Sequence, residues 1–123
     1  FDADDAELER LSMIGTGSVV QVTRAAEAVD GANAVHTDTW VSMGQENEKA
    51  ARRRAFEGYT VDAGIMTAAA PDAIFMHCLP AYRGFEVTAD VIDGPQSVVF
   101  QQGHNRMHAA RAALAFILSG VGR

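Results

Sequence analysis

Hydrophobic and polar positions change their spacing repeatedly along the chain, in a way that predicts alternating strands and helices. Short apolar runs of strand length lie at residues 18–23, 33–38, 74–78 and 97–100. Stretches of helical character surround and separate them, at residues 4–15, 24–31, 46–56, 62–73, 88–94 and 105–120. Short apolar runs between turn residues are typical of buried strands, whereas helix formers that end at glycine are typical of helices.

The order of these elements predicts the fold class. Strands that are continuously apolar and alternate with helices favour a parallel sheet that is covered on both faces. We therefore expect an α/β fold, built as a three-layer, Rossmann-like parallel sheet with helices on both faces. No repeat, low-complexity segment or Gly/Ser-rich linker divides the sequence, so residues 1–123 are expected to form a single domain.

Composition and charge narrow the possible partners. A formal net charge of −6 argues against non-specific binding to nucleic acid or to an anionic membrane. The single cysteine, Cys78, cannot form an internal disulfide, which fits a reducing cytoplasm. No apolar run approaches the ~18 residues that a membrane span needs. We therefore expect a soluble, cytoplasmic protein with neither nucleic acid nor membrane as a partner.

Three polar segments each follow a predicted strand. They are TDTWVSMGQE at residues 37–46, HCLPAYRG at residues 77–84 and QQGHNR at residues 101–106. In an open parallel sheet the carboxyl ends of the strands share one edge, and ligands bind in the crevice outside that edge. The three segments should therefore converge on a crevice that binds a small charged molecule.

Individual residues in these segments have both structural and chemical interpretations. Cys78 is either a small buried side chain or a thiol presented at the crevice, and the four histidines, His36, His77, His104 and His108, leave a histidine-activated cysteine nucleophile open. Asp38 either caps a loop or receives an ammonium group. Arg106 is either a surface charge or a ligand for a phosphate or a developing oxyanion.

Two further patterns have simple explanations. His104 and His108 lie four residues apart and could share one helix face, but no other ligand cluster accompanies them, so no metal and no cofactor is expected. The basic run at residues 49–54 is expected to be the solvated face of a helix, with Glu48 four residues before Arg52 in the favourable ion-pair order.

The motifs of these segments also resemble a known family. TDTWVSMGQE and FMHCLPAYRG, followed by NRMHAARAAL, are similar to the second half of the ornithine carbamoyltransferases. Asp38 followed after three residues by Ser-Met-Gly, with a later His-Cys-Leu-Pro, resembles the ornithine-using members. The aspartate-using relatives have a proline where Cys78 stands. The resemblance runs from about Gly17 to the end of the chain.

The resemblance implies a function. Members of the family transfer the carbamoyl group of carbamoyl phosphate to the δ-amine of ornithine, giving citrulline and phosphate, in arginine biosynthesis or the urea cycle. They have one domain for carbamoyl phosphate and one for the amino acid, and assemble as homotrimers. The chain resembles most of the amino-acid domain, so residues 1–123 are expected to be one incomplete domain that is inactive alone. The implied partners are ornithine, carbamoyl phosphate and further copies of the chain.

The resemblance also implies roles for particular residues. Asp38 resembles the acid that holds the amino groups of ornithine, Cys78 the thiol beside the δ-amine, and Arg106 the ligand of the carbamoyl oxygen; these three form the expected catalytic set. The Leu79 carbonyl resembles the acceptor for the carbamoyl NH2 group, and the Leu79–Pro80 peptide bond is expected to be cis. The full set of expected substrate-binding residues is Asp38, Ser42, Met43, Gly44, His77, Cys78, Leu79, Pro80 and Arg106.

The chemistry of the reaction agrees with these residue types. The δ-amine of ornithine, with a lysine-like pKa of about 10.4, must lose a proton before it attacks. An arginine stabilises the charge that develops on the carbamoyl oxygen, so no covalent cysteine intermediate is needed. A carbamoyltransferase for another amine, such as putrescine or an acylated ornithine, stays open, as do a cysteine hydrolase and an amino-acid-sensing module.

Overall fold

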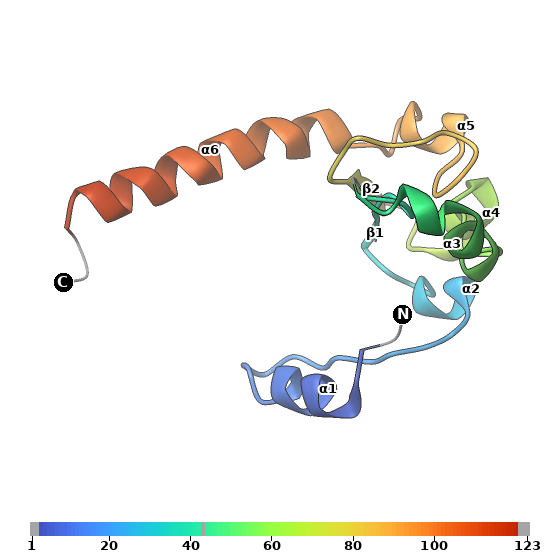
Figure 1. Cartoon of the computed structure of the whole chain (residues 1–123), viewed down its shortest axis with the longest axis horizontal. Helices are drawn as coiled ribbons and strands as arrows, with labels where there is room; N and C mark the ends of the chain where they lie inside the picture. Colours follow the sequence, from blue (N-terminus) through green and yellow to red (C-terminus); the bar gives the residue numbers. More distant parts are fainter. Residues whose placement is uncertain (1–2, 43, 121–123) are drawn as a thin grey trace.

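The computed structural model describes residues 3–42 and 44–120. Along the chain these residues form nine elements: α1 (Asp5–Ser12), α2 (Ala25–Ala28), β1 (Ala34–Thr37), the 3-10 helix η1 (Glu46–Glu48), α3 (Lys49–Ala55), α4 (Ala63–Ala68), β2 (Ile74–His77), α5 (Ala89–Ile92) and α6 (Val99–Leu118). Figure 1 shows the two strands at the centre, with α3, α4 and α5 grouped on one side and α6 extending away on the other. None of the described helices has both the length and the apolar character needed to cross a membrane.

Side-chain caps explain where two of the helices begin. The carboxylate of Asp4 accepts the Glu7 backbone N–H at 2.8 Å at the start of α1. Asp62 does the same for the Ile65 N–H at 2.9 Å at the start of α4. An N-cap acid satisfies a backbone donor that the helix itself cannot, and it interacts favourably with the helix dipole. Both helices begin within the ranges predicted from the sequence.

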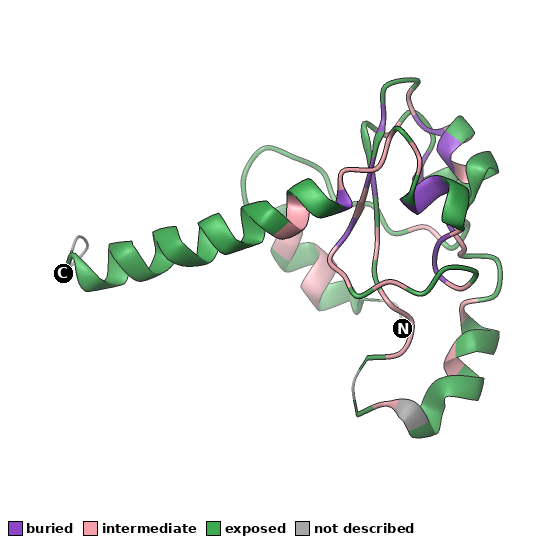
Figure 2. Ribbon diagram, turned by 90° about the horizontal axis from the view of Figure 1, so that it is seen from above, coloured by how far each residue is buried: buried purple, intermediate pink, exposed green. Residues whose placement is uncertain are grey.

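The sheet consists of two parallel strands whose carboxyl ends are level with each other. β1 and β2 pair from Ala34 opposite Ile74 to Thr37 opposite His77. One face of the sheet is buried, because Val35, Phe75 and His77 are at most 5% exposed. Figure 2 shows this buried layer in purple, continuing into α4 and α5. The α/β class predicted from the sequence is confirmed.

The predicted strand at residues 97–100 is wrong. Only Ser97 forms a β-bridge, parallel to Phe75, and the chain then enters α6 at Val99. The Phe75 N–H donates to the Gln96 carbonyl at 2.8 Å, and the Phe75 carbonyl accepts the Val98 N–H at 3.0 Å. The Gln102 N–H then donates to the Val98 carbonyl at 2.8 Å, and this bond begins the helix. Within the apolar run Val99 is buried in the first turn of the helix whereas Phe100 is 76% exposed, and a window this short could not distinguish a helix start from a strand.

The predicted strand at residues 18–23 is also wrong. Residues 18–22 lie outside every helix and strand, and Val19 and Val20 are 47% and 77% exposed. The described contacts of this segment use side chains: Gln21 accepts the Ala3 N–H, and the Tyr59 hydroxyl donates to the Thr23 carbonyl. A strand requires a paired neighbour, and the described residues place none beside this segment.

The last helix differs from its prediction in where it begins. It starts at Val99, six residues before the predicted start at residue 105, and runs to Leu118. Val99 is buried, whereas Leu114, Phe116, Ile117 and Leu118 are each more than half exposed. Figure 2 accordingly shows most of α6 as exposed ribbon. The helix is therefore anchored to the sheet by its first turns.

Candidate active site

Asp38 and Cys78 face each other at the carboxyl end of the sheet. Each is the residue immediately after its strand, and the last strand residues, Thr37 and His77, are paired. The Cys78 thiol donates a hydrogen bond to Oδ1 of Asp38 at 2.9 Å. The same carboxylate oxygen accepts the Thr39 backbone N–H at 2.6 Å. Parallel pairing therefore brings two residues forty positions apart into direct contact.

Arg106 reaches the same place from α6. Its Nη1 donates to the Cys78 carbonyl oxygen at 2.6 Å. A guanidinium has five N–H donors in a fixed fork, so one bond to a carbonyl leaves other donors able to meet a ligand. Asp38, Cys78 and Arg106 are therefore linked through Cys78 at the carboxyl edge of the sheet, which Arg106 reaches from a helix and not from the predicted third strand.

The hydrogen bond between Asp38 and Cys78 shifts the pKa of both side chains. The Cys78 thiol is the main cause that lowers the pKa of Asp38, and the Thr39 N–H acts in the same direction against partial burial, as do His77 and His36 when their rings are protonated. The pKa of Cys78 is raised, first by this bond and then by burial and the Asp38 charge. At neutral pH the carboxylate is therefore ionised and the thiol protonated. A protonated thiol is a poor nucleophile, which argues against a cysteine hydrolase.

Leu79 and Pro80 form an unusual turn after Cys78. Leu79 has φ of 58°, which is positive and uncommon for a residue with a branched side chain, and the Leu79–Pro80 bond is cis. The Leu79 N–H donates to Nδ1 of His77 at 2.8 Å. His77 is fully buried. The expected cis bond is confirmed, and the buried imidazole helps to hold the turn.

His77 also contacts an acid that the sequence did not single out. Because Nδ1 accepts the Leu79 N–H, the neutral ring carries its hydrogen on Nε2, which lies 3.4 Å from Oε1 of Glu86. Glu86 is 1% exposed and also accepts the Tyr82 N–H at 2.5 Å. At this distance Nε2 of His77 makes no hydrogen bond, and neither it nor Oε2 of Glu86 has a hydrogen-bond partner among the described residues. In the sequence Glu86 is one more polar residue between apolar ones, so no pattern identified it.

The Ser-Met-Gly loop lies beside this cluster. Ser42 is exposed, and its carbonyl accepts the Gln45 N–H at 3.1 Å in a turn that contains Gly44 with φ of 86°. Met43 lies outside the described residues. Ser42 lines a hollow of about 150 Å³ together with Thr39, Trp40, Val41, Lys49, Arg53, Tyr82, Phe85 and Glu86. Trp40 and Arg53 here, like Glu86, had not been predicted to contribute to a site.

Three titratable groups of the cluster lie close enough together to share a metal ion, but their contacts do not favour one. Ligand atoms of Asp38, His77 and Cys78 lie within 4.8 Å of one another. However, Nδ1 of His77 is an acceptor for Leu79 and its Nε2 faces Glu86, so neither nitrogen is directed to a shared ion. His104 and His108 have ring centroids 5.0 Å apart, and both are exposed on α6.

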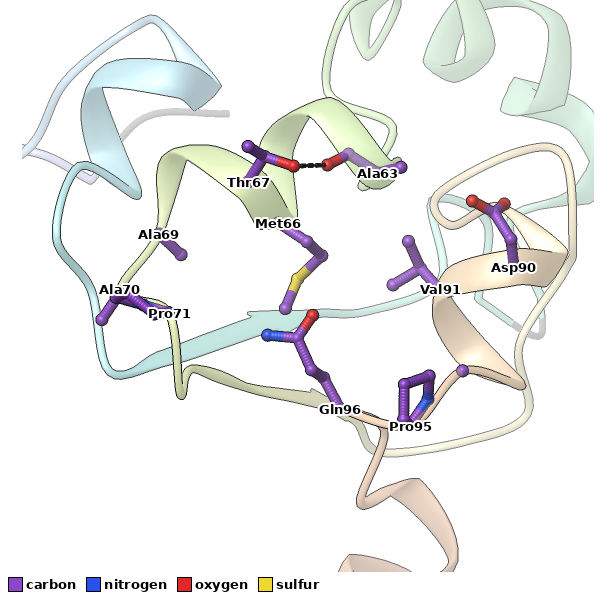
Figure 3. Close-up of a pocket in the computed structure, with 11 residues that line it drawn as sticks. Ala63, Met66, Thr67, Ala69, Ala70, Pro71, Asp90, Val91, Pro95 and Gln96 are labelled. Carbon is purple, nitrogen blue, oxygen red and sulfur yellow. Dashed lines mark hydrogen bonds between the residues drawn. The ribbon is translucent and has the colours of Figure 1, made fainter.

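A second hollow lies elsewhere on the molecule. It has a volume of about 470 Å³ and is formed by α4, α5 and the turn before Ser97, as Figure 3 shows. Met66, Asp90, Val91 and Gln96 are among its lining residues, and none of the residues predicted for the site contributes to it. Gln96 has a structural role here, because its side-chain NH2 donates a hydrogen bond to the Ala73 carbonyl at 2.8 Å.

Comparisons with known proteins show which family the chain resembles. The family model for the "Aspartate/ornithine carbamoyltransferase, Asp/Orn binding domain" matches residues 2–117. An ornithine carbamoyltransferase of Caldicellulosiruptor saccharolyticus is 61% identical over 120 residues, which cover 98% of this chain and 37% of that protein. The chain therefore spans a little over a third of the length of this relative.

Solved structures give the same result. The ornithine carbamoyltransferase of Pyrococcus furiosus is 49% identical with a TM-score of 0.71, over 79% of this chain and 31% of that one. The ornithine carbamoyltransferase of Gloeobacter violaceus is 39% identical with a TM-score of 0.77, over 91% of this chain and 37% of that one.

Proposed function

Since the chain belongs to the Asp/Orn-binding domain family of the aspartate/ornithine carbamoyltransferases, we propose that it is the ornithine-binding part of an ornithine carbamoyltransferase. The reaction forms a bond between the δ-nitrogen of ornithine and the carbamoyl carbon. The bond from that carbon to the phosphate oxygen breaks, phosphate leaves, and the amine releases a proton. The observation that carries the proposal is a pair of hydrogen bonds at Cys78. Its thiol donates to Asp38 at 2.9 Å, and its carbonyl accepts from Arg106 at 2.6 Å.

Asp38 is the proposed ligand for the amino groups of ornithine. Its carboxylate is ionised at neutral pH, and the lowered pKa extends this form to more acidic conditions, so it attracts an ammonium group to the edge of the sheet. A free δ-ammonium with a pKa of about 10.4 is almost wholly protonated at neutral pH and cannot attack. The site must therefore bind the amine in an orientation from which the proton is lost before the bond to carbon forms.

Arg106 is the proposed ligand for the carbamoyl oxygen. Attack of the amine converts the planar carbamoyl carbon into a tetrahedral centre and places negative charge on its oxygen. A guanidinium fixed in a site that excludes water stabilises that charge more than water does, and loss of one such donor typically costs about 10²–10³-fold in rate. The bond from Arg106 to the Cys78 carbonyl sets the position of the guanidinium in the ligand-free chain.

Cys78 is proposed to position other groups and not to attack. Its protonated thiol orients the Asp38 carboxylate, and its carbonyl orients Arg106. Leu79, with its positive φ, is proposed to present its carbonyl to the carbamoyl NH2 group, and Ser42, Met43 and Gly44 to close over the α-amino and α-carboxylate groups of ornithine.

A chimera tests the proposal directly. The matched 37% of the Caldicellulosiruptor enzyme would be replaced by this chain, and citrulline formation from ornithine and carbamoyl phosphate measured. We expect citrulline, and a loss on the order of 10²-fold or more when Arg106→Ala is introduced. A folded chimera that makes no citrulline would refute the function. Equal rates with putrescine or N-acetylornithine would assign another amine instead.

We also propose that the chain acts as the single amino-acid-binding domain of a longer, two-domain protein, which assembles as a homotrimer in the cytoplasm and serves arginine biosynthesis. The match to an amino-acid-binding domain, over 37% of the length of a relative, supports the domain assignment. Sedimentation of the chimera, expected as a trimer, tests the assembly.

A further inference from the structure

The outer edge of β2 is completed by two glutamine side chains. In the middle of this edge, Phe75 pairs with the main chain on both sides of Ser97. At one end the Ala73 carbonyl accepts the side-chain NH2 of Gln96 at 2.8 Å. At the other end the His77 N–H donates to Oε1 of Gln102 at 2.9 Å. Side-chain amides therefore make the hydrogen bonds that the main chain of a full neighbouring strand would supply.

The Gln102 side chain also contacts the other strand. Because its Oε1 is the acceptor for His77, its Nε2 is the donor, and this nitrogen lies 3.3 Å from Nε2 of His36 on β1. Gln102 is half-buried at the end of the first turn of α6. One residue of the helix therefore bonds to both strands, close to their carboxyl ends.

Arg106 lies one helical turn after Gln102. Residues four apart share a face of a helix, so the face that Gln102 fixes against the sheet is the face that carries Arg106. The later turns of α6 are exposed and give little restraint, as the burial of the described residues in Figure 2 shows. The rotation and the depth of the helix at Arg106 therefore depend on its first two turns.

We propose that Gln102 is a positioning residue for Arg106. The Gln102 amide accepts the His77 N–H, which the main chain of a neighbouring strand would otherwise accept. The chain can therefore leave the sheet and form a helix immediately after Val98. The amide also locks that helix so that the guanidinium reaches the Cys78 carbonyl at 2.6 Å. The consequence for catalysis rests on the proposed carbamoyl transfer, whereas the structural part does not.

Kinetics in the chimera test the catalytic part. Gln102→Met keeps the length of the side chain and removes both bonds, so kcat should fall by on the order of 10²-fold, with KM for ornithine changed less than about threefold. Gln102→Glu keeps an acceptor for the His77 N–H and should recover most of the rate. Gln101→Met, at the exposed neighbouring position, is the matched control and should leave kcat unchanged.

A double-mutant cycle separates positioning from a general loss of stability. If Gln102 acts through Arg106, Gln102→Met should change kcat by less than about twofold in a chimera that already carries Arg106→Ala. If the kcat losses of Gln102→Met and Arg106→Ala multiply in the double variant, the proposal is overturned. An unchanged kcat in Gln102→Met alone would overturn it as well. If Gln102→Met does not fold, Gln102→Asn, whose amide is too short to span the same gap, takes its place.

NMR of the 123-residue chain tests the structural part without any activity. The His77 amide should exchange slowly with solvent, and the Arg106 guanidinium should give a distinct, slowly exchanging signal. Both properties should disappear in Gln102→Met and persist in Gln101→Met. Unchanged signals in Gln102→Met would overturn the positioning role even if the chimera makes citrulline. A chimera without activity whose chain shows the expected losses would refute the function and leave the positioning intact.

Discussion

The hydrogen bond between Asp38 and Cys78 shifts the pKa values of the two side chains in opposite directions. The bond lowers the pKa of the carboxyl group and raises the pKa of the thiol, so each group stays in the form that the other requires. The carboxylate can attract a cation while the thiol acts as a donor. The one cysteine of the chain is therefore best understood as part of a binding site and not as a nucleophile.

Removing the charge of Asp38 should make Cys78 more reactive. In Asp38→Asn the thiol bond loses its ionised acceptor and Cys78 loses a neighbouring negative charge, so the thiol pKa should fall toward its ordinary value and the thiolate fraction at pH 7–8 should increase. The pH dependence of Cys78 alkylation by iodoacetamide measures this change. Asp72→Asn, at an exposed position, is the control. A thiol pKa that rises or stays constant in Asp38→Asn would contradict the assignment.

Removing the thiol should in turn raise the pKa of Asp38. The folded-state pKa of Asp38 lies below the unfolded value of about 3.9, so its contribution to stability is present above that pH and is lost as the pH falls through the lowered folded-state pKa. Cys78→Ala removes the main cause and should move the carboxyl titration upward, as followed by 13C NMR. Cys78→Ser, which keeps a hydroxyl donor, should move it less. An unchanged Asp38 titration in Cys78→Ala would be inconsistent with the bond.

β2 is the element on which the site depends. It pairs with β1 on one edge and with Ser97 and the two glutamines on the other, and it ends at the residue that precedes Cys78. Phe75, fully buried, packs at the centre of this strand. Its packing therefore supports the edge from which Cys78 and Leu79 extend.

Truncation of Phe75 should destabilise the fold far more than truncation of its neighbour. Phe75→Ala should lower the free energy of unfolding by about 3–5 kcal/mol, because it leaves a cavity in the core. Ile74→Ala, at a position 38% exposed, should cost only about 1 kcal/mol. Urea denaturation followed by circular dichroism measures both. Equal losses would mean that the buried face of β2 had been assigned wrongly.

Viewed as a whole, the molecule has a small packed body with a long helix that projects from it (Figure 1). The outer part of that helix carries large apolar side chains that nothing described covers, including Phe116 at 58%, Ile117 at 67% and Leu118 at 83% exposed. Exposed apolar surface of this kind favours association.

The isolated chain should therefore self-associate. Sedimentation velocity at increasing concentration should show species larger than the monomer, and the combined substitutions Leu114→Gln, Ile117→Gln and Leu118→Gln should reduce them. The control is a triple substitution of exposed polar residues elsewhere, Glu9→Gln, Glu27→Gln and Asp72→Asn, which should leave association unchanged. A chain that stays monomeric at all concentrations would contradict this expectation.

The sequence by itself determined the fold class, most of the helices, both strands of the sheet and the edge at which Asp38 and Cys78 meet. These features follow from local spacing and from the rule that parallel strands end together, so neighbouring residues suffice to predict them. The paired geometry of Asp38 and Cys78 follows from the same rule, since each residue directly follows its strand. Arg106 was assigned to the same edge through a strand at residues 97–100 that does not form, and it reaches the edge from a helix instead.

Only the tertiary structure decided the rest. Whether residues 18–23 and 97–100 become strands depends on a partner at the right place, which a local pattern cannot report. The roles of Glu86 and Gln102 depend on distant groups, His77 for the first and both His36 and His77 for the second, brought within hydrogen-bonding or ion-pair distance by packing. Polar side chains that complete a strand edge or hold a buried ring have no periodic signature, because their partners are set by the fold and not by their sequence neighbours.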